Sequence, residues 1–378
     1  MKIAILLPYK ENFSKNETGA VSIFVNSINK LSEYKDNINI FGSTNFKPLS
    51  KNYENLNFKK KFYLSSSKTY LENFLQKIND RKFDILEIHN RPHYLNYISN
   101  LENTKKIIFF HNNPLQMQGS ETINDRLNIY TKADTLIFNS IWTKTQFLND
   151  LPINVDDSKI KIVPQSTSKV KINFSKKKKI ISFVGKLNTA KGYDIFGEAI
   201  IKILKKYTEW SSIVIGNEPR QKLFYNHPRL KILGFKDNDY VLNKLKEVSI
   251  SVVPSKWDEP FGRSSLEAAS RGCAIIRSDK GGLNETTSSS IVLSKLTSDE
   301  LYKQLDLLIK KPTNLKKLQV KTFKQFKLTN SSSSNLLDKI RDDLIKPKQE
   351  ISIKCLKILH ITNFNERFNG RLHYNTSK

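Results

Sequence analysis

Two glutamates within one short segment carry the clearest chemical pattern in the sequence. Glu259 lies in a loop before a helical pattern that begins near Gly262, and Glu267 lies about five residues into that pattern. A helix start offers unpaired backbone N–H groups and the positive end of the helix dipole, which suit a phosphate. With about 1.5 Å of rise per residue, Glu267 stands roughly 7 Å along the helix, within reach of ribose hydroxyls. The segment therefore predicts a site for a ligand that carries phosphate, ribose and sugar, with Glu259 facing the sugar.

The chain around this segment alternates between short apolar runs and longer helical patterns. That alternation is typical of parallel sheets whose strands are joined by helices. The fold class is therefore α/β, with two Rossmann-like halves. We expect strands at 3–7, 38–41, 84–88, 106–110, 135–139 and 160–163, and again at 180–184, 212–215, 230–233, 249–253 and 274–276.

A polar stretch in the middle divides the chain. Residues 1–165 form the expected first domain, 166–179 a linker, and 180–345 a second domain that closes with a long polar helix at 315–345, either whole or broken at the serines 331–334. The linker ends in four lysines, Lys176–Lys179, a run that is typical of a solvated tether and that also suits anionic lipid. Residues 346–378 add an extra strand–loop segment, which is either an edge strand of the first domain or the start of another Rossmann unit.

The net charge narrows the choice of partners. The 378 residues include 63 lysines and arginines against 36 aspartates and glutamates, which gives a formal charge of +27. Such a charge favours nucleic acid, an acidic membrane surface or a phosphorylated ligand, although a lysine-rich solvated surface explains it nearly as well. The two cysteines, Cys273 and Cys355, are too few for a disulfide framework or a thiolate zinc site.

The sequence is not typical of a secreted or membrane-spanning chain. The apolar run at its start is short, is followed by Pro8 and Lys10, and resembles a buried strand more than a secretion signal. Apolar stretches of about 18 residues, the length that spans a bilayer, do not occur. We therefore expect a cytoplasmic protein that is soluble or peripheral to a membrane.

Three sequence elements, taken in order, resemble the motifs of glycosyltransferase family 4. They are VGKLNTAKGYD at 184–194, EPFGRSSLEAASRG at 259–272 and GGLNE at 281–285. Their order and spacing both agree with the family. The resemblance covers about residues 1–345 and implies the GT-B fold, in which two Rossmann-like domains face each other across a cleft.

The resemblance implies a donor site. Lys191 is expected to hold the donor diphosphate together with Lys186, which stands where most relatives have arginine and offers a point charge instead of a planar fork. Cys273 stands where relatives commonly have proline, and we expect it to be a small buried residue. The implied donor-binding residues are Gly19, Gly185, Lys186, Lys191, Leu233, Gly234, Phe235, Glu259, Phe261, Gly262, Arg263 and Glu267.

The first domain supplies candidates at strand ends, where ligands bind in open α/β sheets. His111 follows the expected strand 106–110 directly and resembles the family histidine near the transferred sugar. The implied catalytic residues are His111, Glu259, Lys186 and Lys191. We place His89 and Arg91, which also follow a strand, on the acceptor side.

One pattern suggests a metal. Asp237 and Asp239 form an Asp-x-Asp, which holds a metal in another class of glycosyltransferase. The pattern precedes an expected helix, where aspartate is a common N-cap, and no histidine or carboxylate cluster stands near it in the sequence. The resemblance implies a reaction without a metal, and we expect no cofactor.

The resemblance implies a retaining hexosyltransferase that moves a sugar from a nucleotide-sugar donor to a saccharide or glycolipid acceptor. We expect a role in cell-envelope polysaccharide or lipopolysaccharide synthesis, at the inner face of the membrane. A sugar-nucleotide epimerase shares the GT-B architecture and stays open as an alternative.

Two other functions fit less well. A nucleic-acid-binding protein would show aromatic platforms within a basic stripe, and the lysines are spread along the chain instead, so we expect no nucleic-acid partner. A retaining glycoside hydrolase would need its two carboxylates about 5 Å apart across the substrate, whereas Glu259 is expected in a loop and Glu267 on the helix.

Overall fold

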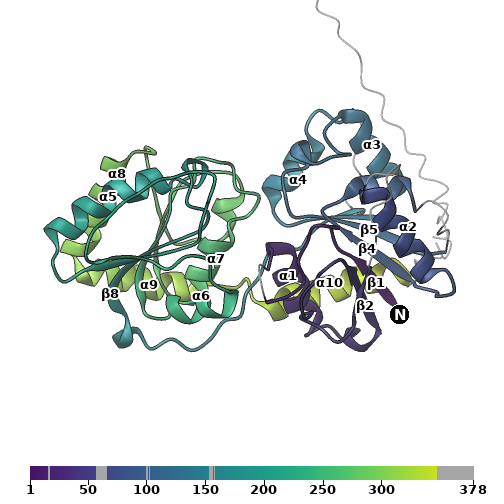
Figure 1. Ribbon diagram of the computed structural model, residues 1–378, viewed down its shortest axis with the longest axis horizontal. Coiled ribbons are helices and arrows are strands. Elements are labelled where there is room, and N and C mark those ends of the chain that lie inside the picture. The colour runs from purple at the N-terminus through teal and green to yellow at the C-terminus, as the bar shows by residue number, and fades with distance from the viewer. Residues whose placement is uncertain are drawn as a thin grey trace, which may run out of the picture. The chain divides into compact units, whose positions relative to one another are not determined.

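The computed structural model describes residues 1–15, 18–56, 66–98, 101, 103–152, 156 and 158–346. Two parallel sheets dominate them (Figure 1). The first sheet has the strand order β3-β2-β1-β4-β5-β6-β7. Its strands are β1 (Ile3–Leu6), β2 (Ile38–Gly42), β3 (Tyr53–Asn55), β4 (Ile85–His89), β5 (Lys105–Phe110), β6 (Thr135–Phe138) and β7 (Ile160–Ile162).

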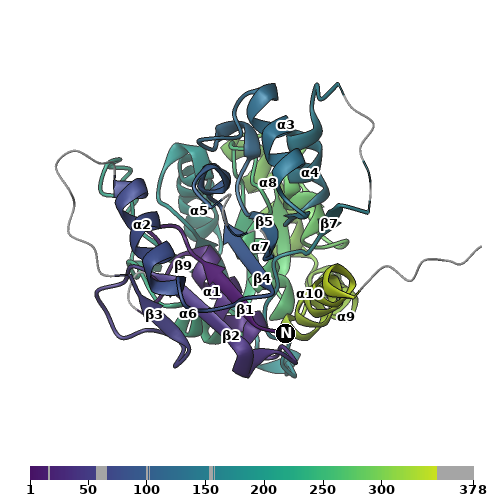
Figure 2. The same ribbon diagram turned by 90° about the vertical axis from the view of Figure 1, so that its right-hand side faces the viewer.

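Helices cover both faces of this sheet, because its strands are apolar on both sides. Ala4 and Leu6 point into one core and Ile3 and Ile5 into the other, as alternate residues of a strand must. The first core is closed by α2 (Ser66–Ile78), α3 (Ile123–Lys132) and α4 (Ile141–Leu148), and the second by α1 (Ala20–Asn29). Figure 2 shows β2, β1, β4 and β5 side by side in the order of the sheet.

The second sheet repeats the design with the order β10-β9-β8-β11-β12-β13. Its strands are β8 (Lys178–Val184), β9 (Ser211–Ile215), β10 (Leu230–Ile232), β11 (Val248–Val253), β12 (Ala274–Arg277) and β13 (Ile291–Val292). Its helices are α5 (Tyr193–Lys206), α6 (Asn238–Leu245), α7 (Arg263–Ser270), α8 (Ser298–Lys310) and α9 (Pro312–Gln325). Short 3-10 helices lie at Lys35–Asn37, Pro92–Asn96, Pro114–Gln116, Phe174–Lys176, Thr189–Lys191 and Gly282–Glu285.

The expected strands are all present, and the structure adds two. β3 and β13 are edge strands of three and two residues, too short and, in β3, too polar to give an apolar run. In each sheet the strand order reverses beside one central strand, β1 in the first and β8 in the second. A ligand crevice is expected at the carboxyl ends of the strands at such a reversal.

The end of the described chain corrects our division into domains. We expected residues up to 345 to belong to the second domain, but α10 (Asn330–Ile345) packs on the first, beside α1. Leu337 and Ile340 enter the same core as Ile3 and Ile5. The long polar helix is broken, but before the serines 331–334: α9 ends at Gln325, and α10 begins at Asn330 and includes the serines.

The chain passes from the first domain to the second and later returns, and the two connecting segments lie against each other. Thr167, on the way out, forms a parallel bridge with Thr329, on the way back. The amide of Thr167 donates to the carbonyl of Leu328 at 3.2 Å, and the amide of Asn330 donates to the carbonyl of Thr167 at 3.2 Å. The connection between the domains is therefore a pair of chain segments tied by two backbone hydrogen bonds.

The lysine run before the second sheet is only partly a solvated tether. Lys177 turns inward, and its Nζ donates to the carbonyls of Leu245, Val248 and Arg271 at 3.0, 2.7 and 2.7 Å. Burial lowers its pKa from the usual value. Lys178 already belongs to β8. The expected extra segment 346–378 lies outside the described residues except for residue 346.

No helix in the described parts of the chain combines the length and the apolar character that crossing a membrane requires.

Candidate active site

A cavity of about 910 Å³ brings together most of the residues that the sequence indicated. It lies at the carboxyl ends of strands from both sheets, where the strand order predicts a crevice. Gly19, Leu233 and Gly234 are not among its lining residues, although Thr18, Ala20 and Phe235 beside them are. The predicted residues that line it are His111, Gly185, Lys186, Lys191, Phe235, Glu259, Phe261, Gly262, Arg263 and Glu267.

The start of α7 forms one wall of this cavity. Gly262 has a φ of 103°, in the left-handed region that favours glycine. A Cβ on Gly262 would also lie 2.3 Å from Cδ2 of Leu283. Because glycine allows this turn, the chain passes from the Glu259 loop directly into α7 at Arg263, as the sequence predicted. The first N–H groups of the helix thus lie at the cavity, where they suit an anion.

Lys191 is placed by the last turn before α5. Its amide donates to the side chain of Asn188 at 3.0 Å. The following Gly192 has a φ of 70°, and a Cβ there would lie 2.0 Å from the carbonyl oxygen of Pro254. The turn is therefore fixed against the end of β11, and Lys191 Nζ reaches Glu259, at 2.6 Å from Oε1 and 2.7 Å from Oε2.

Glu267 is buried and paired as well. Its Oε1 accepts a hydrogen bond from Asn238 Nδ2 at 2.7 Å and lies 2.9 Å from Arg263 Nε. Only 4% of Glu267 is exposed, so the carboxylate depends on these partners for its charge to be tolerated. The sequence predicted both Glu259 and Glu267 as open acceptors, and the structure shows that protein cations or amides occupy each of them.

His111 is held on both ring nitrogens. Nε2 lies 2.9 Å from His89 Nδ1, and Nδ1 lies 2.9 Å from Gln165 Nε2. The ring stacks on Phe109, with the centroids 4.3 Å apart. Burial and then the neighbouring His89 lower the pKa of His111 well below its usual value, so the ring is neutral at physiological pH.

The acceptor-side residues need correction in one case. His89 is fully buried behind His111 and lies in no open surface, because its strand β4 is covered on both faces. Arg91 is partly exposed, and its Nη1 donates to the carbonyl of Asn90 at 2.7 Å. His89 therefore supports the site from behind instead of facing an acceptor.

Two further residues of the cavity lining, Gln165 and Asn238, were missed by the sequence, and a third residue, Glu285, lies outside that lining but joins the two domains. Gln165 contacts His111 from the outgoing connecting segment, and Asn238 contacts Glu267 from α6. Glu285 reaches the first domain, where its carboxylate oxygens accept from the amides of Ile141 and Trp142 at 2.7 and 2.9 Å. Glu285 belongs to the GGLNE element and Asn238 lies between the two aspartates of the Asp-x-Asp pattern, so both had a usable signal, whereas Gln165 has ordinary sequence surroundings.

The Asp-x-Asp pattern forms a helix cap. Asp237 is the N-cap of α6 and accepts from the amide of Tyr240 at 2.8 Å, as predicted. Among the described residues, no three histidine, cysteine, aspartate or glutamate side chains lie together as a metal site would require. Cys273 is buried, as expected, and burial raises the pKa of its thiol.

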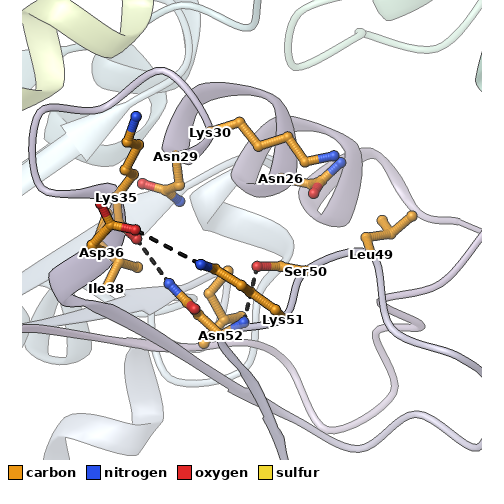
Figure 3. A pocket seen from close by; sticks show the side chains of 11 residues that line it. Asn26, Asn29, Lys30, Lys35, Asp36, Ile38, Leu49, Ser50, Lys51 and Asn52 are labelled. Atoms are coloured by element: carbon orange, nitrogen blue, oxygen red, sulfur yellow. Dashed lines mark hydrogen bonds and ion pairs between the residues drawn. The ribbon is translucent and has the colours of Figure 1, made fainter.

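A separate hollow of about 500 Å³ lies on the first domain, between α1 and residues 49–52 (Figure 3). It contains a lysine–carboxylate contact, between Lys51 Nζ and Asp36 Oδ1 at 4.0 Å. Their side chains are 85% and 72% exposed, so water screens the pair and it contributes little. The residues that line this hollow include none that the sequence predicted for the site.

Residues 164–325 match the family model described as "Glycosyl transferases group 1". The putative glycosyltransferase YtcC of Bacillus subtilis is 22% identical over 252 residues, which cover 59% of this chain and 62% of that protein. The lipopolysaccharide core biosynthesis mannosyltransferase LpcC of Rhizobium leguminosarum is 28% identical over 116 residues, which cover 28% of this chain and 33% of that protein. The chain thus covers less than two thirds of these curated relatives.

The similarity to solved structures extends over a larger part of the chain. The crystal structure of Anabaena HepE in complex with UDP and glucose superimposes with a TM-score of 0.68 at 15% sequence identity. The match covers 90% of this chain and 99% of that one. The chain therefore has the GT-B fold, and its residues 164–325 carry a group 1 glycosyltransferase domain.

Proposed function

We propose that the chain transfers a sugar from a nucleoside-diphosphate donor to a saccharide or lipid-linked acceptor, with retention of anomeric configuration. One observation carries the proposal: Lys191, Glu259, the start of α7 and Glu267 share one cavity. A diphosphate, a sugar and a ribose need a cation, polar acceptors and helix N–H groups in that neighbourhood. Crystals of HepE, which has the same fold, contain UDP and glucose.

The roles follow from these positions. Lys191, Lys186 and the N–H groups of α7 hold the diphosphate, Glu267 accepts from the ribose hydroxyls, and Glu259 accepts from sugar hydroxyls. The anomeric carbon–oxygen bond to the diphosphate breaks while the acceptor oxygen bonds to that carbon from the same face. The acceptor proton passes to the leaving diphosphate. The main contribution of the enzyme is to stabilise the charge that grows on this leaving group.

The two lysines and the helix start supply positive charge where other enzymes use a metal ion, so we propose a reaction that needs no metal or other cofactor. Incubation with EDTA before the assay is then expected to leave the rate unchanged. A rate that falls with EDTA and returns with manganese contradicts this.

We propose a cell-envelope polysaccharide or a lipopolysaccharide as the acceptor, because one relative acts in lipopolysaccharide core biosynthesis. A formal charge of +27 would draw the protein to an anionic membrane surface, such as the inner face of the membrane. Sedimentation with phosphatidylglycerol vesicles, but not with phosphatidylcholine vesicles, and loss of the effect at high salt, is the expected result.

The central experiment is a panel of nucleoside diphosphates and their sugars. Binding of the matching diphosphate should raise the melting temperature, since a ligand that binds only the folded state stabilises it. The matching nucleotide sugar should then be consumed, slowly with water and faster with acceptor. If no nucleoside diphosphate stabilises the protein, or if none of the sugars is released or transferred, the proposal is wrong.

A further inference from the structure

A fully buried arginine lies behind the candidate site. Arg341 comes from α10, the helix that returns from the second domain. Its guanidinium lies 2.7 and 3.0 Å from the two carboxylate oxygens of Glu87 on β4, and 2.9 Å from Asp338. It also donates to the side chain of Asn29 at 3.0 Å. A buried charge is tolerated only with such partners, so α10 and β4 are tied together at this point.

Glu87 connects this arginine to a histidine. Its Oε2 lies 3.7 Å from Nε2 of His89, two residues along the same strand. Burial acts to raise the pKa of Glu87, but the charge of Arg341 and the neighbouring His89 lower it to about 2. Glu87 is therefore ionised, and an ionised carboxylate only accepts hydrogen bonds. At 3.7 Å the two atoms are too far apart for a hydrogen bond, and Nε2 of His89 has no hydrogen-bond partner among the described residues. The negative charge of Glu87 still favours a proton on the nitrogen that faces it.

The line of contacts continues to the cavity. His89 Nδ1 lies 2.9 Å from His111 Nε2, and His111 Nδ1 lies 2.9 Å from Gln165 Nε2. The other amide atom of Gln165, Oε1, accepts from Arg263 Nη1 at 3.2 Å. Arginine has donors only, so the amide oxygen of Gln165 faces Arg263 and its NH2 group faces His111.

The contact of Gln165 with Arg263 at one end and the ion pair of Glu87 with Arg341 at the other together determine where the protons of His111 and His89 lie. Gln165 donates to Nδ1 of His111, so the proton of His111 is on Nε2 and is donated to Nδ1 of His89. The proton of His89 is then on Nε2 and faces Glu87. In this arrangement each ring carries one proton, because one of its nitrogens donates and the other accepts. Moving the proton of either histidine to its other ring nitrogen would place two donors or two acceptors against each other. The hydrogen bond between His89 and His111 would then be lost.

We propose that Arg341 is a positioning residue of the donor site, which acts through Glu87 and His89 to hold His111 with its proton on Nε2. His111 and Gln165 both line the cavity. A sugar hydroxyl that displaces the Gln165 amide then meets an acceptor nitrogen, so His111 selects donor sugars with a hydroxyl that can donate there. This role rests on the proposed function, although the proton positions do not.

The test reads the proton positions directly. The chain has six histidines, and 15N NMR distinguishes the two neutral forms of each ring, with assignment by single His-to-Gln variants. In the parent, His89 and His111 are expected to carry the proton on Nε2. The double variant Glu87→Gln with Arg341→Met removes both buried charges, a change that is often neutral for stability. It should add the Nδ1-protonated form at His111.

Two further variants complete the design. His89→Gln interrupts the line of contacts between Glu87 and His111 but keeps the ion pair of Glu87 with Arg341. It should also disturb the proton position at His111. Leu337→Ala removes core packing from the same helix without touching the line, and it should leave the proton positions as in the parent. In the double variant and in His89→Gln, we expect kcat/KM for the sugar nucleotide to fall about three- to tenfold, the effect of one lost hydrogen bond. Affinity for the free diphosphate should stay constant.

The outcomes separate the two proposals. If the proton of His111 stays on Nε2 in both the double variant and His89→Gln, or moves equally in Leu337→Ala, the positioning role of Arg341 is wrong. It is also wrong if the proton moves and kcat/KM does not. If the parent shows the expected proton positions but uses no sugar nucleotide, it is the proposed function that fails.

Discussion

The ammonium group of Lys191 lies within 2.7 Å of both carboxylate oxygens of Glu259. A donor must therefore replace a protein contact to reach either residue. The same holds for Glu267, which is paired with Arg263, and for His111, which contacts Gln165. When no donor is bound, the polar and charged side chains of the cavity pair with one another. Whether a substitution strengthens or weakens donor binding therefore depends on which of these pairs it breaks.

Glu259→Gln should bind the free nucleoside diphosphate more tightly than the parent, because Lys191 is released from a carboxylate. The gain is expected to be about two- to fivefold, the typical strength of a partly exposed ion pair. Calorimetric titration with the diphosphate measures it. The same variant should discriminate less well among donor sugars. Weaker binding of the diphosphate would contradict the assignment of Glu259 to the sugar.

Lys191→Met should reduce kcat about a hundredfold at saturating donor, because it removes one charge that stabilises the leaving diphosphate. Single-turnover kinetics on a folded variant checks this, with circular dichroism as the control for the fold. Lys202→Met, which removes one positive charge from an exposed ion pair on α5, is a matched control and should leave kcat unchanged. Comparable rates in the Lys191 variant and the parent would exclude the role.

Glu267→Gln should weaken binding of the free diphosphate about tenfold, because hydrogen bonds to a charged group become neutral ones. The matched control is a 2′,3′-dideoxy diphosphate, which lacks the hydroxyls and should bind parent and variant alike. Calorimetry with both ligands separates the ribose contact from a general change. An equal loss for both ligands would mean that Glu267 supports the cavity instead of contacting ribose.

Glu285→Gln should loosen the contact between the two domains, since the carboxylate of Glu285 accepts from two amides at the start of α4. A carboxylate at this end of a helix is stabilised by both the hydrogen bonds and the dipole. We expect the radius of gyration from X-ray scattering to increase and KM for the donor to rise about three- to tenfold. Glu209→Gln, an equal charge change at an exposed ion pair, should alter neither quantity.

Acid should lower the free energy of unfolding through Glu87 and His111. The pKa of Glu87 is lowered from 4.5 to about 2, so its contribution is complete above pH 4.5 and is lost as the pH falls towards 2. The pKa of His111 is held well below 6.5, so below pH 6.5 the unfolded chain binds a proton that the folded chain does not. Both groups therefore lower the free energy of unfolding as the pH falls. Urea unfolding across this range measures both effects.

The pH effect has an internal control. In the double variant Glu87→Gln with Arg341→Met, the loss of stability between pH 4.5 and 2 should be smaller, because the residue with the lowered pKa is absent. An unchanged pH dependence would mean that other carboxylates account for the acid sensitivity.

The strands and the donor side of the site follow from local sequence patterns. Apolar runs give β1 and β8, and the Glu259–Glu267 segment places a loop and a helix start in fixed register, because both depend on neighbours a few residues away. Contacts between distant residues have no such local signal. Gln165 meets His111 across 54 positions, and Arg341 meets Glu87 across 254.

Misplaced side chains show the same limit. His89 follows the pattern of an exposed strand end, yet its strand is covered on both faces and the ring is buried. Lys177 belongs to a run that looks solvated, and three carbonyls of the second domain hold its ammonium group. Whether a polar side chain faces water depends on what packs over it, which the run of residues around it does not encode.

The return of α10 also determines the order in which the protein can mature. Domains generally fold as units during synthesis, from the N-terminus onward. The first domain cannot do so here, because Leu337, Ile340 and Arg341 complete its core. Until they are made, Glu87 is a carboxylate without its cation in an apolar layer. The second domain, whose described elements end at α9, can therefore finish folding before the first, although it is translated later.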